Sequence, residues 1–406
     1  MEEQFLNKRL DELWQLTQDP DLARATRRML DVGTDLFLSR DLETKILNIR
    51  KKYNSLSEES VDHNPDSYQE QMNNLRAEIE LVCTEVKEKS KVPAQPSVIN
   101  KVMLTTEGLG KVYEGKGRTF RFEPLTLELK TGEITGVVGE NGNGKTTLLR
   151  MLAGDLASTS GTINFPQYHT NEWYEAKQKI GYIPQRIDTW FGTLSDNLKF
   201  TASIHGIKDE ENDYAVDYII ERLGLNKFRD LTWKQISGGY RLRFELAKVL
   251  IRKPQLLILD EPLANLDINA QQLFLQDLKY LSQSIRHPFA VILSSQQLHE
   301  VENISDNLIF IKNGNTLYSG ARRDFGKDRS TNCIELNGQF EKQELIAAIK
   351  DMEGATVEET GTIYIVNFAV NIAPVELLKT LLSKGLMVNY YRDISDSTRK
   401  LFKKDM

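Results

Sequence analysis

Apolar residues recur at helical spacing through the first quarter of the chain. One stripe consists of Leu6, Leu10, Leu13 and Leu16, and a second consists of Leu22, Ala25, Met29 and Val32. Spacings of three and four place each stripe on one face of a helix. Further helices are predicted over about 42–53 and 67–89. Four such helices suit a small bundle over residues 1–95, which we interpret as a docking or dimerisation module.

A different pattern follows the proline-containing linker at 92–96. Short apolar runs alternate with helical patterns over about 101–325. Three of these runs are apolar enough to be strands buried on both faces, namely Ile134–Val138, Leu256–Asp260 and Ala290–Ser294. Strands of this kind, separated by helices, predict an α/β domain with a parallel sheet.

The last segment, 331–406, predicts a third module. Its apolar runs indicate the order strand, helix, strand, strand, helix, strand, with the two central strands joined around Gly361. This β-α-β-β-α-β order matches a ferredoxin-like unit. We therefore expect a small C-terminal α+β accessory domain.

Composition narrows the class of protein. The 406 residues are 40% hydrophobic and 27% charged, with a mean hydropathy of −0.42, which is typical of a soluble globular chain of two or three domains. No window approaches ~18 consecutive apolar residues, so a membrane-spanning helix is not expected. A secretory signal is not expected either. Cys83 and Cys333 lack metal-ligand spacing, and two such cysteines favour a reducing compartment.

Charge argues against nucleic acid as a direct partner. The formal net charge is −6, and residues 1–95, with 14 Lys and Arg against 19 Asp and Glu, carry −5 of it. A protein that binds a phosphate backbone normally shows a basic surface. No direct contact with nucleic acid is therefore expected.

A glycine-rich loop supplies the first candidate chemistry. The motif G-x-x-x-x-G-K-[ST] is matched by Gly139, Glu140, Asn141, Gly142, Asn143, Gly144, Lys145 and Thr146, and Thr147 continues into a predicted helix. The loop follows the predicted strand Ile134–Val138, which is the context that a phosphate-binding loop needs. Glycines let successive N–H groups turn toward a phosphate. Lys145 can reach the β- and γ-phosphates, and the Thr146 hydroxyl can bind Mg²⁺.

Two acidic residues after an apolar strand supply the second piece of candidate chemistry. Asp260 and Glu261 directly follow the run Leu256–Leu259. An acid at that strand end can hold Mg²⁺, and its neighbour can orient or deprotonate an attacking water. Together with the glycine-rich loop, the pair indicates nucleotide hydrolysis.

At this point the sequence resembles the ATP-binding cassette (ABC) family over about 101–325. Segment 236–240, Ile-Ser-Gly-Gly-Tyr, resembles the family signature, and Ser237 lies 23 positions before Asp260, as in the family. Segments 181–185, 264–267 and 292–296 resemble the glutamine loop, the D-loop and the switch loop. The resemblance implies a P-loop cassette fold, Mg²⁺ and ATP as cofactors, and ATP hydrolysis.

The resemblance also implies roles for individual residues. Two cassettes would pair head to tail around two ATPs, with one protomer's signature facing the other's loop. The implied nucleotide contacts, besides the loop 139–147, are Tyr113, Gln185, Ser237, Gly238, Gly239 and Asp267. Thr146, Gln185 and Asp260 are the implied metal ligands, and Glu261, Lys145 and Gln296 are the implied catalytic residues. Phe120 and Phe122 are alternatives to Tyr113 as the surface on which adenine stacks.

Two positions depart from the family pattern. The switch loop usually carries a His, but the aligned residue here is Gln296, whose amide donates a hydrogen bond without carrying a proton. His299 is an alternative for that role. Tyr240 replaces the usual signature Gln. We expect a competent but slow hydrolase, since Lys145, Asp260 and Glu261 are intact.

The family has transporting and non-transporting branches. A transporter subunit would drive a separate transmembrane subunit from the inner face of the cell membrane, where it would be cytoplasmic and peripheral. Trp190 and Phe191 beside the glutamine loop are candidate anchors for that subunit. The cassette with the ending Tyr391–Ser395 most resembles exporter-type bacterial ATPases. The alternatives are a soluble ATPase acting on a ribosome, DNA or another protein, and a nucleotide-dependent regulatory switch.

Overall fold

The computed structural model describes residues 2–19, 22–36, 38–59, 65–89, 100–115, 118–168, 173–264, 266–296, 298–325 and 331–395. The chain divides into two compact units, residues 1–319 and 320–406. The first unit contains the predicted helical bundle together with the α/β domain. Each unit is described separately below.

A six-stranded sheet forms the centre of the first unit. Its order is β5 (Ile180–Ile183), β6 (Leu256–Leu259), β7 (Ala290–Ser295), β3 (Ile134–Val138), β8 (Asn307–Lys312) and β9 (Asn315–Ala321). The strands from β5 to β8 pair in parallel. Every residue of β3, β6 and β7 is buried, which confirms the three strands predicted from their apolar runs. Apolar residues on both faces are what a sheet covered on both sides requires.

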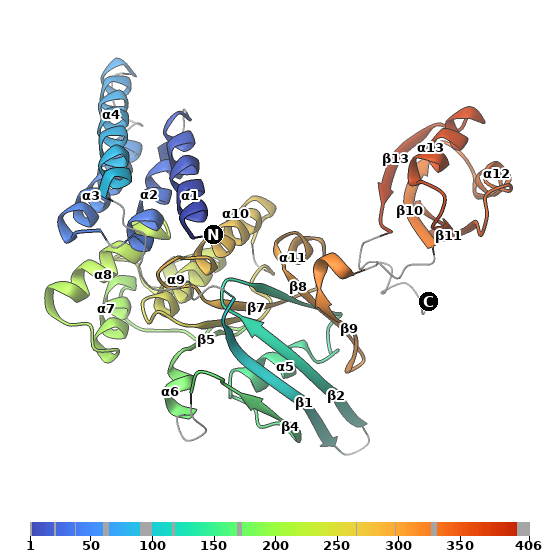
Figure 1. The fold of residues 1–406 in the computed structure, drawn as a ribbon, viewed down its shortest axis with the longest axis horizontal. Helices are drawn as coiled ribbons and strands as arrows, with labels where there is room; N and C mark the ends of the chain where they lie inside the picture. Colours follow the sequence, from blue (N-terminus) through green and yellow to red (C-terminus); the bar gives the residue numbers. More distant parts are fainter. Residues whose placement is uncertain are drawn as a thin grey trace. The chain divides into compact units, whose positions relative to one another are not determined.

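A second, antiparallel sheet packs on the first through one helix. Its order is β2 (Arg118–Lys130), β1 (Val102–Gly115) and β4 (Ser160–Asn164). Helix α5 (Lys145–Leu152) shares one hydrophobic core with strands of both sheets, including Leu148, Phe122 and Ile292. Helix α5, labelled in Figure 1, directly follows the glycine-rich loop in the chain.

The remaining elements of the first unit after β4 are mainly helical. The α-helices are α6 (Trp173–Gln178), α7 (Leu194–Ile204), α8 (Asp209–Arg222), α9 (Gly238–Leu250), α10 (Ile268–Ser282) and α11 (Leu298–Ile304). Short 3₁₀ turns in this unit are η1 (Asn226–Phe228) and η2 (Trp233–Gln235), whereas η3 (Arg322–Asp324) lies at the start of the second unit. Helices α7, α8 and α9 contact one another and form a helical region beside the sheet.

The N-terminal bundle has a hydrophobic core of its own. Its helices are α1 (Glu2–Thr17), α2 (Leu22–Asp35), α3 (Arg40–Glu59) and α4 (Pro65–Lys89). The predicted stripe residues whose side chains are described and fully buried are Leu10, Leu13, Leu22, Ala25, Met29 and Val32. The helical prediction for this segment is thus confirmed.

The bundle docks on the rest of its own unit. Tyr214 and Tyr218 of α8 and Ile285, after α10, pack against the bundle core. Helix α2 contacts α8, and α3 contacts α8 as well (Figure 1). The bundle is therefore not a separate body within the first 319 residues.

Buried charges reinforce this docking. Asp31 of α2 bonds Arg222 of α8 at 2.6 Å and Arg28 at 2.8 Å. Arg28 also approaches Asp277 of α10, at 3.5 Å. Burial by itself raises the pKa of Asp31, but Arg222 and Arg28 outweigh burial and hold that pKa below its usual value. Helix α2 is thereby tied to the helical region and to α10 at once.

The second unit contains a four-stranded antiparallel sheet and two helices. In chain order the elements are β10 (Thr331–Gly338), α12 (Lys342–Ala348), β11 (Thr356–Thr360), β12 (Ile363–Ala369), α13 (Pro374–Ser383) and β13 (Val388–Asp393). The sheet order is β11-β12-β10-β13. This is the predicted β-α-β-β-α-β order, packed around its own hydrophobic core.

Both cysteines are buried and free. Burial, with the nearby Glu80, raises the pKa of the Cys83 thiol to about 12, so this thiol is unreactive. Among the residues that the structure describes, none of the helices has both the length and the apolar character needed to cross a bilayer.

Candidate nucleotide site

The glycine-rich loop connects the end of β3 to α5 and depends on its glycines. Gly144 has a φ of 104°, and a Cβ there would lie 2.9 Å from Phe122 and 3.0 Å from Phe120. A Cβ on Gly139 would lie 2.4 Å from the carbonyl oxygen of Ile311. Side chains at these positions would displace the loop, so the sequence motif reflects close packing as well as backbone freedom.

Lys145 begins α5 with its ammonium group folded back over the loop. Its Nζ donates hydrogen bonds to the carbonyl oxygens of Gly139, at 2.7 Å, and Glu140, at 3.2 Å. The side chain is only 5% exposed. The loop backbone thus fixes a cation at the start of a helix, where anions are favoured.

Asp260 lies at the end of β6, beside the start of α5. One of its oxygens accepts from the Thr146 hydroxyl at 2.7 Å, and the other accepts from Ser294 at 2.6 Å. Two hard oxygen groups from separate segments, Thr146 Oγ1 and Asp260 Oδ2, therefore meet next to the loop. Such donors suit Mg²⁺.

Glu261 is held by three partners in an uncommon backbone conformation. Its φ is 47°, in the left-handed region that non-glycine residues seldom adopt. Its N–H donates to Ser294 Oγ at 2.8 Å. Its two carboxylate oxygens bond Lys145 at 3.0 Å and the Gln296 amide at 2.6 Å. Backbone strain of this kind often accompanies functional sites, since surrounding contacts must maintain it.

Two residues that support the site, Ser294 and Asn313, were not among the predicted site residues. Ser294 joins Asp260 to the Glu261 backbone, and it is completely buried at the end of the apolar strand β7. Asn143 accepts from the Asn313 N–H at 2.9 Å and ties the loop to the turn after β8. A polar residue in a buried apolar run could have indicated Ser294, whereas no local pattern indicated the contact with Asn313.

The candidate adenine surface lies on β1 and β2. Tyr113 is 39% exposed, and its ring centroid lies 6.2 Å from that of Phe120. Phe122 is only 1% exposed and belongs to the core, so it offers no face to a ligand. Tyr113 and Phe120 are left as candidates for stacking.

Among the described residues, the other predicted contacts make no hydrogen bond with this network. Gln185 is exposed after β5. Ser237 and Gly238 are exposed where α9 begins, and the Ser237 side chain makes no capping hydrogen bond there. Asp267 caps α10 by accepting from the Ala270 N–H at 2.9 Å. Gly239 lies in the first turn of α9 and is half-buried.

The two departures from the family pattern occupy different surroundings. Gln296 lies in the network, bonded to Glu261. Tyr240 instead packs against Phe228, with ring centroids 3.8 Å apart, inside the helical region. The side chain of His299, the alternative to Gln296, lies outside the described residues, as does Asn265 of the D-loop segment.

Comparisons with known proteins show what this chain is similar to. A family model described as "ABC transporter" matches residues 122–264. The linearmycin resistance ATP-binding protein LnrL of Bacillus subtilis is 30% identical over 252 residues, which is 61% of this chain and 76% of that relative. The methionine import ATP-binding protein MetN of Geobacillus kaustophilus is 30% identical over 225 residues, which is 54% of this chain and 65% of that relative.

A solved structure is also similar. It is cbiO1 from Clostridium perfringens, part of the ABC transporter complex cbiONQ, with a TM-score of 0.49 and 25% identity over 56% of this chain and 91% of that one. The matched segment 122–264 contains the glycine-rich loop, the signature and the two acids. From these similarities, the chain belongs to the ABC transporter family, as one of its ATP-binding proteins that hydrolyse ATP.

Proposed function

We propose that this ATP-binding subunit hydrolyses ATP with the network around Glu261 and uses the energy to drive a separate transmembrane subunit, in the direction of export. One observation carries the proposal. Lys145, Glu261 and Gln296 form a continuous polar contact beside the Thr146–Asp260 pair. The phosphate-binding group, the acid and the metal-ligand candidates therefore share one location.

The chemistry follows from where these groups lie. The backbone N–H groups of 139–147 and the Lys145 ammonium would bind the phosphates. Thr146 and Asp260, with Gln185, would hold Mg²⁺, which neutralises charge on phosphate oxygens. Lys145 now contacts Glu261, so the anionic phosphates compete with this carboxylate for the same cation. Once released, Glu261 can accept a proton from an attacking water that Gln296 helps to position.

A second copy of the chain would complete the site. Ser237, Gly238 and Gly239 are displayed at the start of α9, and the Ser237 hydroxyl is unused as a cap. In a head-to-tail pair these groups, and Asp267, would face the nucleotide held by the partner. ATP would then promote pairing, and hydrolysis would release it.

The helical region offers an apolar surface for a transmembrane subunit. Phe191 is 95% exposed, and on α7 Phe200 is 67% and Ile204 is 62% exposed. Trp190 packs inward against Phe244, with ring centroids 4.5 Å apart. It can therefore support the neighbouring residue Phe191, but it does not serve as an anchor itself. Exposed aromatic residues beside well-packed side chains are suited to form a binding hot spot. In this arrangement the protein is peripheral on the inner face of the cell membrane.

The proposal is tested by purifying the tagged full chain from native membranes in mild detergent. We expect a multi-spanning protein to co-purify stoichiometrically, and Phe191→Ser to reduce its recovery at least tenfold. An exposed polar substitution on α6, Glu175→Gln, is the matched control and should leave recovery unchanged. Recovery of the chain only in the soluble fraction, or with a ribosome or other soluble partner, would instead support the non-transport branch.

A further inference from the structure

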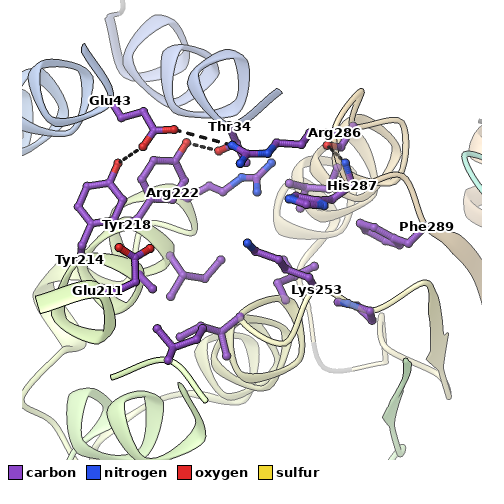
Figure 2. Close-up of a pocket in the computed structure, with 18 of the residues that line it drawn as sticks. Thr34, Glu43, Glu211, Tyr214, Tyr218, Arg222, Lys253, Arg286, His287 and Phe289 are labelled. Atoms are coloured by element: carbon purple, nitrogen blue, oxygen red, sulfur yellow. Dashed lines mark hydrogen bonds and ion pairs between the residues drawn. The ribbon is translucent and has the colours of Figure 1, made fainter. Parts of the chain in front are cut away.

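A cavity of about 300 Å³ lies where the N-terminal bundle meets the rest of its unit. Thr34, Arg40 and Glu43 of the bundle form one side of it (Figure 2). Helix α8, the end of α9 and the segment between α10 and β7 form the others. Cavities of this size hold small organic ligands. It is distinct from the nucleotide site, because none of its lining residues belongs to the network around Glu261.

The inner wall of the cavity is aliphatic. Ile219, Ile251, Leu281 and Phe289 line it, and each of these side chains is at most 6% exposed. The half-buried Leu250 lines it as well. Such a wall favours an apolar group of several carbons, since burying apolar surface is worth about 25 cal/mol per Å². The wall alone does not distinguish neutral from charged ligands.

The acids at the rim already have partners. Glu211 pairs with Arg40 at 3.2 Å, and Glu43 accepts from the Tyr214 hydroxyl at 3.4 Å and lies 4.0 Å from Arg286. These contacts neutralise the carboxylates at this end of the cavity. Arg222, which also lines the cavity, pairs with Asp31 at 2.6 Å.

Lys253 and His287 differ from these groups. Both line the cavity, and within the described part of the chain neither side chain has an ion pair or a hydrogen bond (Figure 2). Burial, and then Lys253, Arg286 and Arg222 in that order, together lower the pKa of His287 to about 4. The imidazole is therefore neutral at pH 7 and lies in a positive potential. A single negative charge would be balanced by Lys253 and could accept a hydrogen bond from His287.

We propose that the cavity binds an aliphatic monocarboxylate, with its carboxylate at Lys253 and His287 and its apolar chain against Ile219 and Leu281. A single carboxylate fits better than a doubly charged phosphate, because Lys253 is the one lining cation in the described residues that lacks a carboxylate partner. The ligand would contact the bundle, α8 and the segment after α10 together. Its binding would therefore strengthen the attachment of the bundle to the rest of the unit. The proposal does not depend on transport.

Titration of the full chain with decanoate, at submicellar concentration and pH 7.5, tests the proposal. We expect saturable binding by calorimetry and a rise in Tm. Lys253→Glu, an exposed position, should weaken binding at least tenfold, whereas Lys350→Glu, at an exposed lysine outside the cavity, should not change it. Ala215→Leu, which adds three carbons inside the cavity on a helix that tolerates leucine, should also weaken binding at least tenfold.

A second measurement reports on the cavity itself. The chain has five histidines, and the resonance that disappears in His287→Asn identifies His287 by NMR. Decanoate should raise the His287 pKa from about 4 by at least one unit, because a nearby anion favours the imidazolium.

Several outcomes would overturn the proposal. One is equal binding by wild type, Lys253→Glu and Ala215→Leu. A second is equal binding of decyltrimethylammonium, which shares the tail but not the charge. A third is tighter binding of decyl phosphate, which would reject a monocarboxylate as the ligand. An unchanged His287 pKa at saturation would place the decanoate elsewhere.

Discussion

Glu261 is the residue on which the proposed hydrolysis depends most directly. It contacts Lys145 through one oxygen and Gln296 through the other. Glu261→Gln keeps the size and hydrogen-bonding reach of the side chain but removes the base. Turnover should fall about 10²–10⁴-fold, and ATP-bound pairs should accumulate.

Steady-state ATP hydrolysis and size-exclusion chromatography with ATP measure the two effects. Glu175→Gln, the exposed α6 control, should change neither. If Glu261→Gln hydrolysed ATP as fast as the wild type, its assignment as the base would be wrong.

Gln296 stands where the family usually has a His, and the effect of this difference on turnover can be measured with a single substitution. Its amide donates to Glu261 at 2.6 Å, a contact that an imidazole at the same position could also make. Gln296→His should therefore maintain or raise the turnover number. A steep loss of turnover at unchanged ATP affinity would mean that the amide is specifically adapted to this site.

Sequence motifs predicted the residues of this network better than its connections. Lys145, Thr146, Asp260 and Glu261 carry local patterns, because a phosphate needs glycines and a cation at fixed spacing. Ser294 joins Asp260 to the Glu261 backbone from a strand 33 residues away in the chain. That contact depends on the order of strands in the sheet, which no local spacing encodes.

At the scale of elements, α2 is the main connection between the bundle and the rest of its unit. Its carboxylate Asp31 faces Arg222 of α8, whose side chain is 13% exposed, and also Arg28. Asp31→Asn removes the carboxylate paired with Arg222 and leaves Arg28 only its contact with Asp277, so the free energy of unfolding should fall by about 3–5 kcal/mol.

Urea unfolding followed by circular dichroism measures this loss. Asp41→Asn, at an exposed position in the first turn of α3, is the control and should cost no more than about 1 kcal/mol. A loss no larger than that of the control would show that the ion pairs contribute little to docking.

The low pKa of His287 predicts that the stability of the folded protein depends on pH. Its pKa in the folded protein is about 4, below the ~6.5 of an unfolded chain, so the unfolded state binds more protons between these values. Stability attributable to His287 is therefore complete above pH ~6.5 and is lost as the pH falls toward 4. His287→Asn should flatten the fall in Tm over this window, whereas an unchanged slope would exclude His287 as its origin.

Helix and strand patterns predicted the elements but not the docking of the bundle. Periodic leucines identified the helices, and buried runs identified the central strands, because each pattern reflects burial along one element. Asp31 and Arg222 lie 191 positions apart, and Asp31 looks like any surface acid in the sequence. The sequence predicted that the bundle is a docking or dimerisation module, but it did not identify the surface on which the bundle docks.

At the scale of the molecule, the two units contribute differently to the conclusions. The first contains the nucleotide network, the exposed aromatic residues and the monocarboxylate cavity. The second has the predicted strand and helix order around a separate core, but fold alone does not assign it an activity. The division of the chain into bundle, cassette and accessory domain stays a prediction.

The bundle precedes in the chain the helices on which it docks, and this order has a consequence for its synthesis. Helix α4 ends at Lys89, whereas α10 ends at Ser282. At roughly 5–20 residues per second, a ribosome needs about 10–40 s to add the residues between them. The bundle has its own apolar core and can close during that interval. Its docking face includes Asp31 and also Asp35, which in the folded chain accepts from the Ile285 N–H at 3.0 Å. Until the rest of its unit is made, the growing chain therefore presents carboxylates beside the apolar surface that α8 later covers.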